Sequence, residues 1–194
     1  NIYQAQEATL LPKISNMKTL GTVYETSRGC PYKCIYCDWG GGTYTKISKK
    51  PYTTVLDEWE WLTKNGAKGI IIADANFGIM PIDYDIAEHI VSMKKKYGHP
   101  IGISLEESKN NPDRTMKINQ LLAENNLLMR HKIAVQTLND EIRDNIDRID
   151  VDFETQIKNC LEMKSKFPNL PIKIETIIGL PGDNYQVTLN QIEV

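Results

Sequence analysis

The chain has 194 residues, 41% of them hydrophobic, with 23 basic and 25 acidic side chains and a formal net charge of −2. This balance is typical of a soluble globular protein; it argues against a disordered chain and against a broad basic surface for nucleic acid. The longest aliphatic run, residues 69–73, is too short to cross a membrane, and no secretory signal is visible, so we expect a cytoplasmic protein.

Short apolar runs alternate with amphipathic segments along the chain. We expect a lead-in or linker at residues 1–20 and one core domain over residues 21–194, with the chain being part of a longer protein. Strands are predicted at residues 22–26, 70–73, 101–105, 132–136 and 172–178. Helices are predicted from a capping box at Thr54, at 84–97, from Pro112, at 139–147, at 152–166 and from about 184. Five β/α units predict an α/β fold, with a parallel sheet that is either doubly wound or a barrel.

Three of the four cysteines, Cys30, Cys34 and Cys37, lie in a C-x3-C-x2-C pattern directly after the first predicted strand. Three thiolates on one short loop can hold three irons of a four-iron cluster, and the fourth iron would stay open to a small molecule. Cys160 falls on a predicted helix and is expected to be buried like a small apolar residue. The alternative is a zinc-binding interaction module without redox chemistry, although zinc usually takes four ligands and no second ligand pair is visible.

The segment Cys30-x3-Cys34-Ile-Tyr36-Cys37, with its aromatic residue before the third cysteine, resembles the signature of the radical S-adenosylmethionine (radical SAM) enzymes. The resemblance implies a partial (β/α)6 TIM-like barrel, here about five β/α units with the last strand missing. It also implies a [4Fe-4S] cluster that reductively cleaves S-adenosylmethionine to a 5′-deoxyadenosyl radical, which abstracts hydrogen from an organic substrate. A low-potential donor, flavodoxin or ferredoxin, would supply the electron, and neither nucleic acid nor a membrane is an expected partner.

The same resemblance implies a set of S-adenosylmethionine contacts. Asp74 and Asn76 stand where the family carries a Gly-Gly-Glu-like element that meets the methionine amino group. Gln136 ends the fourth predicted strand, and Arg148 follows at the distance where several subgroups carry an arginine, which suits the methionine carboxylate.

Further contacts are expected around the adenine and the substrate. The strand end at Ile177 and Gly179, within a Gly-Leu-Pro-Gly sequence, would lie beside adenine, and Tyr36 would shield the cluster. Glu106 and Glu107 follow the third predicted strand, so we place them on the active-site face of the sheet.

Three stretches, residues 26–34, 37–40 and 74–79, resemble the subgroup of radical SAM enzymes that carry a cobalamin-binding domain. Many members of that subgroup are methyltransferases that act on unactivated carbon in small molecules or peptides. The sequence has no cobalamin-binding motif, so cobalamin, if used, would sit on a domain outside this chain. The substrate is expected to be a small molecule or a peptide.

Overall fold

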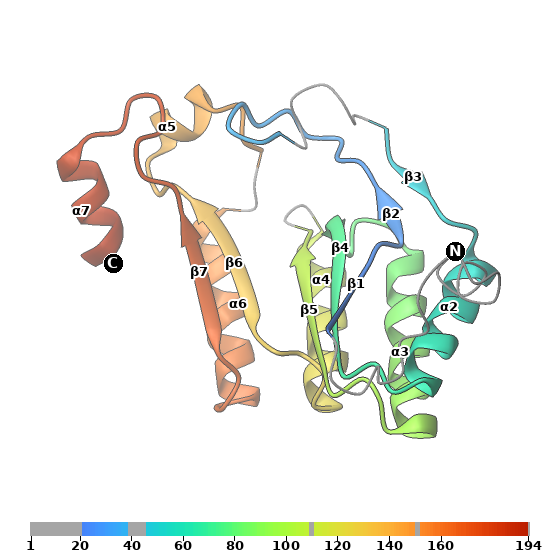
Figure 1. Cartoon of the computed structure of the whole chain (residues 1–194). Helices are drawn as coiled ribbons and strands as arrows, with labels where there is room; N and C mark the ends of the chain where they lie inside the picture. The colour runs from blue at the N-terminus through green and yellow to red at the C-terminus, as the bar shows by residue number, and fades with distance from the viewer. Residues whose placement is uncertain (1–20, 39–45, 109–110, 150–151, 194) are drawn as a thin grey trace.

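The computed structural model describes residues 21–38, 46–108, 111–149 and 152–193 (Figure 1). The parallel strands are β1 (Gly21–Tyr24), β4 (Gly69–Phe77), β5 (Gly102–Glu107), β6 (His131–Gln136) and β7 (Ile172–Thr176). The helices are α2 (Tyr52–Lys64), α3 (Ile82–Tyr97), α4 (Pro112–Glu124), α5 (Asp140–Asn145), α6 (Phe153–Lys166) and α7 (Tyr185–Glu193). Two short strands, β2 (Ser27–Arg28) and β3 (Ser48–Lys49), pair antiparallel. The predicted lead-in at residues 1–20 lies outside the described residues.

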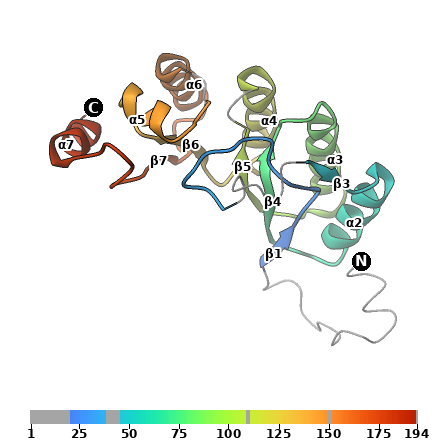
Figure 2. The ribbon, with the colours of Figure 1, turned by 90° about the horizontal axis from the view of Figure 1, so that it is seen from above.

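The strands form a partial barrel. One parallel sheet has the order β1-β4-β5, and a second consists of β6 and β7. Helices α2, α3, α4 and α6 lie along one side of these strands, as the view from above shows (Figure 2). The α/β prediction is therefore confirmed, and the arrangement is a barrel rather than a doubly wound sheet. No helix in the described ranges is long and apolar enough to span a membrane.

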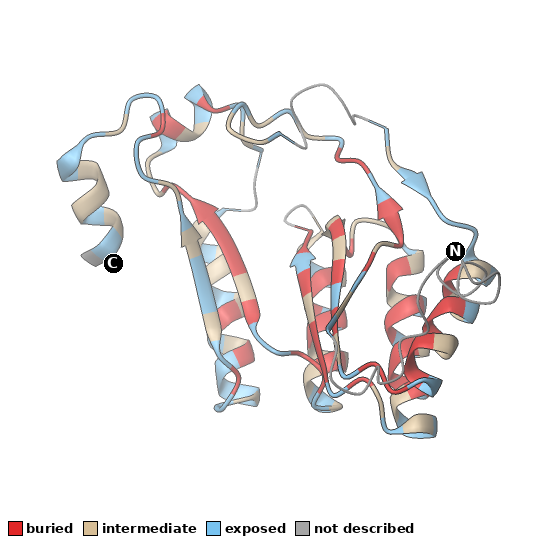
Figure 3. Ribbon diagram, viewed as in Figure 1, coloured by how far each residue is buried: buried red, intermediate tan, exposed pale blue. Residues whose placement is uncertain are grey.

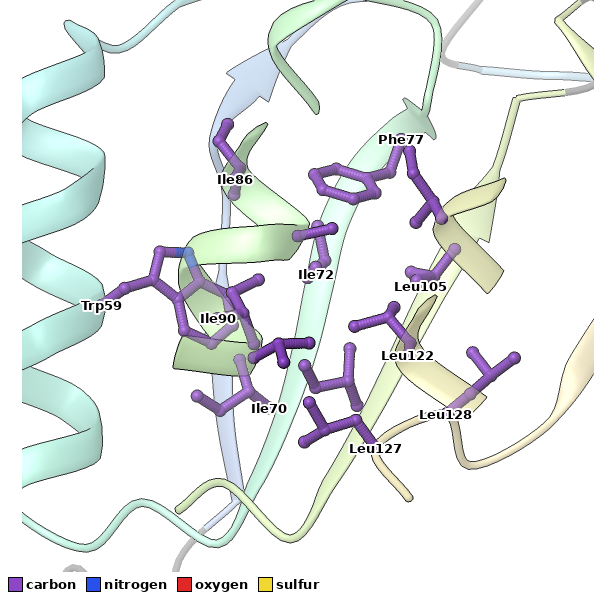
Figure 4. Close-up of a cluster of buried hydrophobic side chains, with 14 of the residues drawn as sticks. Trp59, Ile70, Ile72, Phe77, Ile86, Ile90, Leu105, Leu122, Leu127 and Leu128 are labelled. Carbon is purple, nitrogen blue, oxygen red and sulfur yellow. The ribbon is translucent and has the colours of Figure 1, made fainter. Parts of the chain in front are cut away.

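The main core lies between the sheet β1-β4-β5 and helices α2, α3 and α4. Its central side chains include Trp59, Ile70, Ile72, Phe77, Ile90 and Leu122 (Figure 4). Burying each such side chain contributes about 1.5–3 kcal/mol. Because side chains alternate along a strand, the neighbouring Val23 and Ile71 point to the opposite face and are more than half exposed. Burial thus marks the helix-facing side of the sheet, and the other face is the barrel interior; Figure 3 shows buried and less buried residues alternating along β4.

Several predicted boundaries need correction. The first strand ends at Tyr24 rather than residue 26, because the backbone N–H groups of Thr26 and Ser27 turn to the Asp74 carboxylate. Helix α2 begins at Tyr52 after Pro51, and no side chain caps it, so the capping box predicted at Thr54 is wrong. Pro51 itself occupies the N-cap position, with a ψ of 136°, and its carbonyl accepts the Val55 N–H at 3.1 Å.

Strands β4 and β5 are longer than predicted. β4 runs to Phe77, past a register shift between Ile72 and Phe77, so Asp74 and Asn76 lie within the strand rather than after it. β5 runs to Glu107, which places Glu106 and Glu107 on the strand as well. β7 ends at Thr176, two residues before the predicted end. Strand pairing with neighbours far along the chain extends β4 and β5 beyond their apolar runs.

The two parallel sheets meet at a seam between β5 and β6. The backbone joins them by one isolated bridge, Ile103 to Leu128, before β6 begins. Beyond it, Glu107 Oε1 accepts a hydrogen bond from the Lys132 backbone N–H at 2.9 Å and lies 3.2 Å from Nδ1 of His131. Both partners of this ion pair are buried. A side chain thus replaces part of the backbone pairing between the two halves of the barrel.

The seam makes stability depend on pH. Burial disfavours the charged imidazole of His131, but hydrogen bonds with Cys160 and Glu107 outweigh it and raise its pKa to about 9. The stabilisation is therefore complete below the unfolded-state pKa of about 6.5 and is lost as the pH rises through 9. We expect the free energy of unfolding, measured by urea titration, to fall by about 3 kcal/mol between pH 6.5 and 9.5.

Two variants separate this pair from other titrating groups. Glu107→Gln should reduce the pH dependence in this range, whereas His89→Gln, at a half-buried histidine whose ring contacts the Leu56 carbonyl of α2, should leave it intact. A Glu107→Gln protein that loses stability with pH as steeply as the unmodified protein would contradict the assignment.

Candidate functional site

A cavity of about 480 Å³ opens at the carboxyl ends of the parallel strands. It brings together eight of the predicted site residues, namely Cys30, Cys34, Cys37, Tyr36, Asp74, Asn76, Gln136 and Arg148. Residues from both halves of the barrel line it, so the seam between β5 and β6 runs through its floor. The predicted adenine contacts lie outside this lining: Ile177 packs in a small cluster with Ile142 and Leu180, and Gly179 is exposed.

The root of the cysteine loop is anchored by Asp74. One of its carboxylate oxygens accepts the Thr26 backbone N–H at 2.7 Å; the other accepts the Ser27 backbone N–H at 2.9 Å and the Ser27 hydroxyl at 2.7 Å. The Thr26 hydroxyl donates to the same carboxylate. The side chain is 2% exposed, and burial raises the pKa of Asp74 although these hydrogen bonds oppose the rise. Of the two residues expected to meet the methionine ammonium, Asp74 or Asn76, Asp74 lines the cavity while its carboxylate holds the root of the loop.

Asn76, two residues further along β4, contacts the first cysteine. Its side-chain Nδ2 donates to Cys30 Sγ at 3.1 Å. Cys30 is buried, whereas Asn76 is half-buried and borders the cavity. Within the described residues no partner is seen for the Asn76 amide oxygen, which could accept a hydrogen bond from an ammonium group in the cavity.

The far side of the loop is held by the segment after α5. The Ile35 backbone N–H donates to the Ile146 carbonyl at 3.1 Å, and the Arg148 guanidinium donates to the Tyr36 hydroxyl and to the Ala134 carbonyl. Within the loop, the Cys37 backbone N–H donates to the Cys34 carbonyl at 3.0 Å, which forms a tight turn. Contacts on both sides therefore fix the path of the three cysteines.

At this turn, burial and a nearby positive charge shift the pKa of Cys34 in opposite directions. Burial raises the pKa of the Cys34 thiol, while the guanidinium of Arg148 and a hydrogen bond with Tyr36 pull it down. Burial likewise raises the pKa of Tyr36, to about 12, so its hydroxyl keeps its proton. Arg148 thus provides positive charge beside thiols that must ionise to bind metal.

Gln136 lies where β6 ends, at a register shift in its pairing with β7. Its backbone φ is 66°, which an L-residue rarely adopts, and its carbonyl accepts the Ile177 N–H at 2.9 Å. The carboxyl end of β6 therefore bends at the cavity, and its last residue holds Ile177, one of the predicted adenine contacts, by a backbone hydrogen bond.

Sequence reasoning missed two charged residues on the barrel's inner face. Lys132 Nζ lies 2.7 Å from Glu106 Oε1 and 3.0 Å from Glu175 Oε1, which crosslinks β5, β6 and β7. Glu106 and Glu175 border the cavity. The alternation of side chains along a strand could have indicated both residues. Glu175 pairs with Ala134 across β7 and β6, and Lys132 lies two residues before Ala134, on the same face of β6.

The donor set of the cavity could hold an iron–sulfur cluster. In the part of the chain that the structure describes, no group of three His, Cys, Asp or Glu side chains lies close enough to bind one metal ion. The thiolates that hold a four-iron cluster can lie farther apart than the ligands of a single ion, because each thiolate binds a different iron. The three loop cysteines are free thiols lining one cavity, and the fourth, Cys160, is buried on α6 as expected.

Comparison with known proteins places this geometry in a family. The chain matches the radical SAM superfamily over residues 24–189. It belongs to the radical SAM superfamily. Members of this family use a [4Fe-4S] cluster and S-adenosylmethionine.

Two curated relatives share substantial sequence with this radical SAM chain. It is 33% identical over 159 residues to the cobalamin-dependent radical SAM methyltransferase TokK of Streptomyces tokunonensis. It is 31% identical, also over 159 residues, to the 2-(S-pantetheinyl)-carbapenam-3-carboxylate methyltransferase of Streptantibioticus cattleyicolor. Each match covers 82% of this chain but 23% of the relative's length.

Among solved structures, the radical SAM methyltransferase TsrM from Kitasatospora setae, with tryptophan and a SAM analogue bound, superimposes with a TM-score of 0.72. The superposition covers 91% of this chain and 34% of that chain, at 15% identity. At this identity the likeness supports the fold, and it agrees with the partial barrel described above.

Proposed function

We propose that this chain is the core of an enzyme that reductively cleaves S-adenosylmethionine, with Cys30, Cys34 and Cys37 as the cluster ligands. The observation that carries the proposal is one cavity lined by the three thiols together with Asn76, Gln136 and Arg148. The bound cluster would supply the electron that breaks a C–S bond of S-adenosylmethionine, giving methionine and a 5′-deoxyadenosyl radical.

The residues of this chain would bind and orient the methionine end. The Arg148 guanidinium donates to Tyr36 and Ala134 at the edge of the cavity, and its positive charge would attract the methionine carboxylate. The Asn76 amide oxygen would accept from the ammonium group. Gln136 would contact the middle of the cofactor, and Tyr36, held by Arg148, would screen the cluster from solvent.

The adenine end of the cofactor would lie at the turn that follows β7. Ile177 and Gly179 remain the proposed adenine contacts, since they follow β7 beside the bent end of β6. Gly179 has a φ of 82°, and its N–H donates to Asp183, so the turn has a defined shape.

The class of reaction we propose is cobalamin-dependent C-methylation of a small molecule or peptide, with cobalamin on a domain outside this chain. The two curated relatives are methyltransferases by name, and one is named as cobalamin-dependent. Flavodoxin or ferredoxin is the proposed electron donor. A cytoplasmic setting belongs to the same proposal, because the free thiols must stay reduced to bind iron.

The products of S-adenosylmethionine test this proposal. The whole protein, reconstituted anaerobically with iron, sulfide and cobalamin, is reduced with dithionite and supplied with S-adenosylmethionine. Radical formation leaves 5′-deoxyadenosine, and methyl transfer leaves S-adenosylhomocysteine, so we expect both by mass spectrometry. Protein that carries four irons and sulfides yet forms no 5′-deoxyadenosine would refute the proposed activity, and bound zinc without iron would favour the interaction module.

Arg148→Met should weaken S-adenosylmethionine binding while the cluster remains. Loss of a charge-assisted contact costs about 1.5–3 kcal/mol, which corresponds to a rise in Kd of roughly 10- to 100-fold, measurable by equilibrium dialysis. Arg143→Met is the matched control, since Arg143 lies on α5 and pairs with Asp140 outside the cavity. Equal Kd values for the Arg148→Met and unmodified proteins would remove Arg148 from the binding site.

A further inference from the structure

The side-chain amide of Asn76 is placed against one proposed cluster ligand. Its Nδ2 lies 3.1 Å from Cys30 Sγ, although the two residues are 46 positions apart in the sequence. Cys30 is 8% exposed, so the contact is largely shielded from water. Hydrogen bonds of this kind are stronger in such surroundings than on an exposed surface.

The contact between Asn76 and Cys30 needs a donor on the amide and an acceptor on the sulfur. A thiolate that binds iron carries no proton and can only accept a hydrogen bond, and the NH2 group is the donor of an asparagine side chain. If the amide were turned round, its oxygen would face the sulfur and the two would repel. The orientation in the structure is therefore the one that a ligated Cys30 requires.

The backbone on the carboxyl side of Asn76 fixes the position of the donor. The next residue, Phe77, pairs with Glu107 of β5, and the Asn76 carbonyl accepts the Ile79 N–H at 3.1 Å. Two residues earlier, Asp74 fixes Thr26 and Ser27 at the root of the loop that carries Cys30. Both ends of the contact are thus tied to β4, and reduction needs no rearrangement of the donor.

We propose that Asn76 raises the reduction potential of the cluster through its hydrogen bond to Cys30. Reduction adds negative charge that is shared by the ligand sulfurs, so a fixed N–H donor stabilises the reduced form more than the oxidised form. Hydrogen bonds to the sulfurs are among the factors that set cluster potentials. This inference rests on the proposed function only in taking Cys30 as a cluster ligand.

A redox titration followed by EPR, on the whole protein without S-adenosylmethionine, tests it. Asn76→Leu keeps the approximate shape but removes the donor, and we expect the ratio of reduced to oxidised cluster at a fixed potential to fall about tenfold, a shift of about 59 mV. Asn76→Asp, which places a negative charge beside the sulfur, should shift the potential further in the same direction. Asn125→Leu, which removes a donor to Leu121 on α4, should leave the potential unchanged.

Iron and sulfide are counted in every variant. Loaded Asn76 variants with an unchanged potential would overturn the inference while leaving the proposed function intact. If these variants fail to hold iron, unmodified protein labelled with ¹⁵N in the asparagine side chain is measured by pulsed EPR. A hyperfine coupling between a side-chain ¹⁵N and the reduced cluster supports the hydrogen bond, and its absence overturns it. Unmodified protein that assembles no four-iron cluster would instead refute the proposed function.

Discussion

Alanine at Cys30, Cys34 or Cys37 is expected to abolish both the cluster and all 5′-deoxyadenosine formation. Each thiolate would hold its own iron, and in the part of the chain that the structure describes Cys160 lies on the helix-facing side, away from the cavity. No other cysteine could therefore substitute for a lost one. Iron and sulfide analysis with the visible absorption spectrum measures the cluster, and mass spectrometry measures turnover.

Cys160→Ala is the matched control within the same chain. Cys160 packs with Ile133 and Val135 behind β6, so this change should cost about 1 kcal/mol of stability and leave the cluster in place. Full activity in any of the three loop variants, or cluster loss in Cys160→Ala alone, would contradict the ligand assignment.

Asp74→Ala should destabilise the protein and disorganise the cysteine loop together. The change leaves two buried backbone N–H groups and two hydroxyls, on Thr26 and Ser27, without their acceptor. Unsatisfied buried donors cost about 1–3 kcal/mol each, so we expect the free energy of unfolding to fall by about 3 kcal/mol or more. Iron content after reconstitution should fall as well, because the chain enters the loop through these two residues.

A second buried aspartate separates the two effects. Asp83 accepts the Gly78 and Met80 N–H groups at 2.8 and 2.9 Å, at the start of α3. Asp83→Ala should lower stability to a similar extent but should not reduce iron content beyond what the loss of folded protein explains. Equal iron loss in the two variants would mean that Asp74 acts through stability alone.

The local features of this protein were predictable from its sequence. The three cysteines fall within eight residues, so their spacing alone indicated a cluster loop. The five parallel strands were visible because runs such as Ile70–Ile72 are buried on the helix-facing side and apolar throughout. The family was predicted from the resemblance of the cysteine segment to the radical SAM signature, and the match over residues 24–189 confirms it.

The long-range contacts were not predictable in the same way. Asp74 meets Thr26 across 48 positions, and Arg148 meets Tyr36 across 112. No periodicity or motif encodes such pairs; they depend on how β4 and the segment after α5 fold onto the loop. This is why the sequence did not reveal that the Asp74 carboxylate holds the loop. Glu107 was misplaced for a related reason, since its partners His131 and Lys132 lie on another strand.

Low-temperature EPR of the anaerobically reconstituted, reduced whole protein, with and without S-adenosylmethionine, tests the central claim most directly. Three cysteine ligands leave one iron open, so the account predicts a reduced four-iron signal that shifts when S-adenosylmethionine is added. A four-iron signal that stays the same at saturating S-adenosylmethionine would contradict an open iron site beside Asn76 and Arg148.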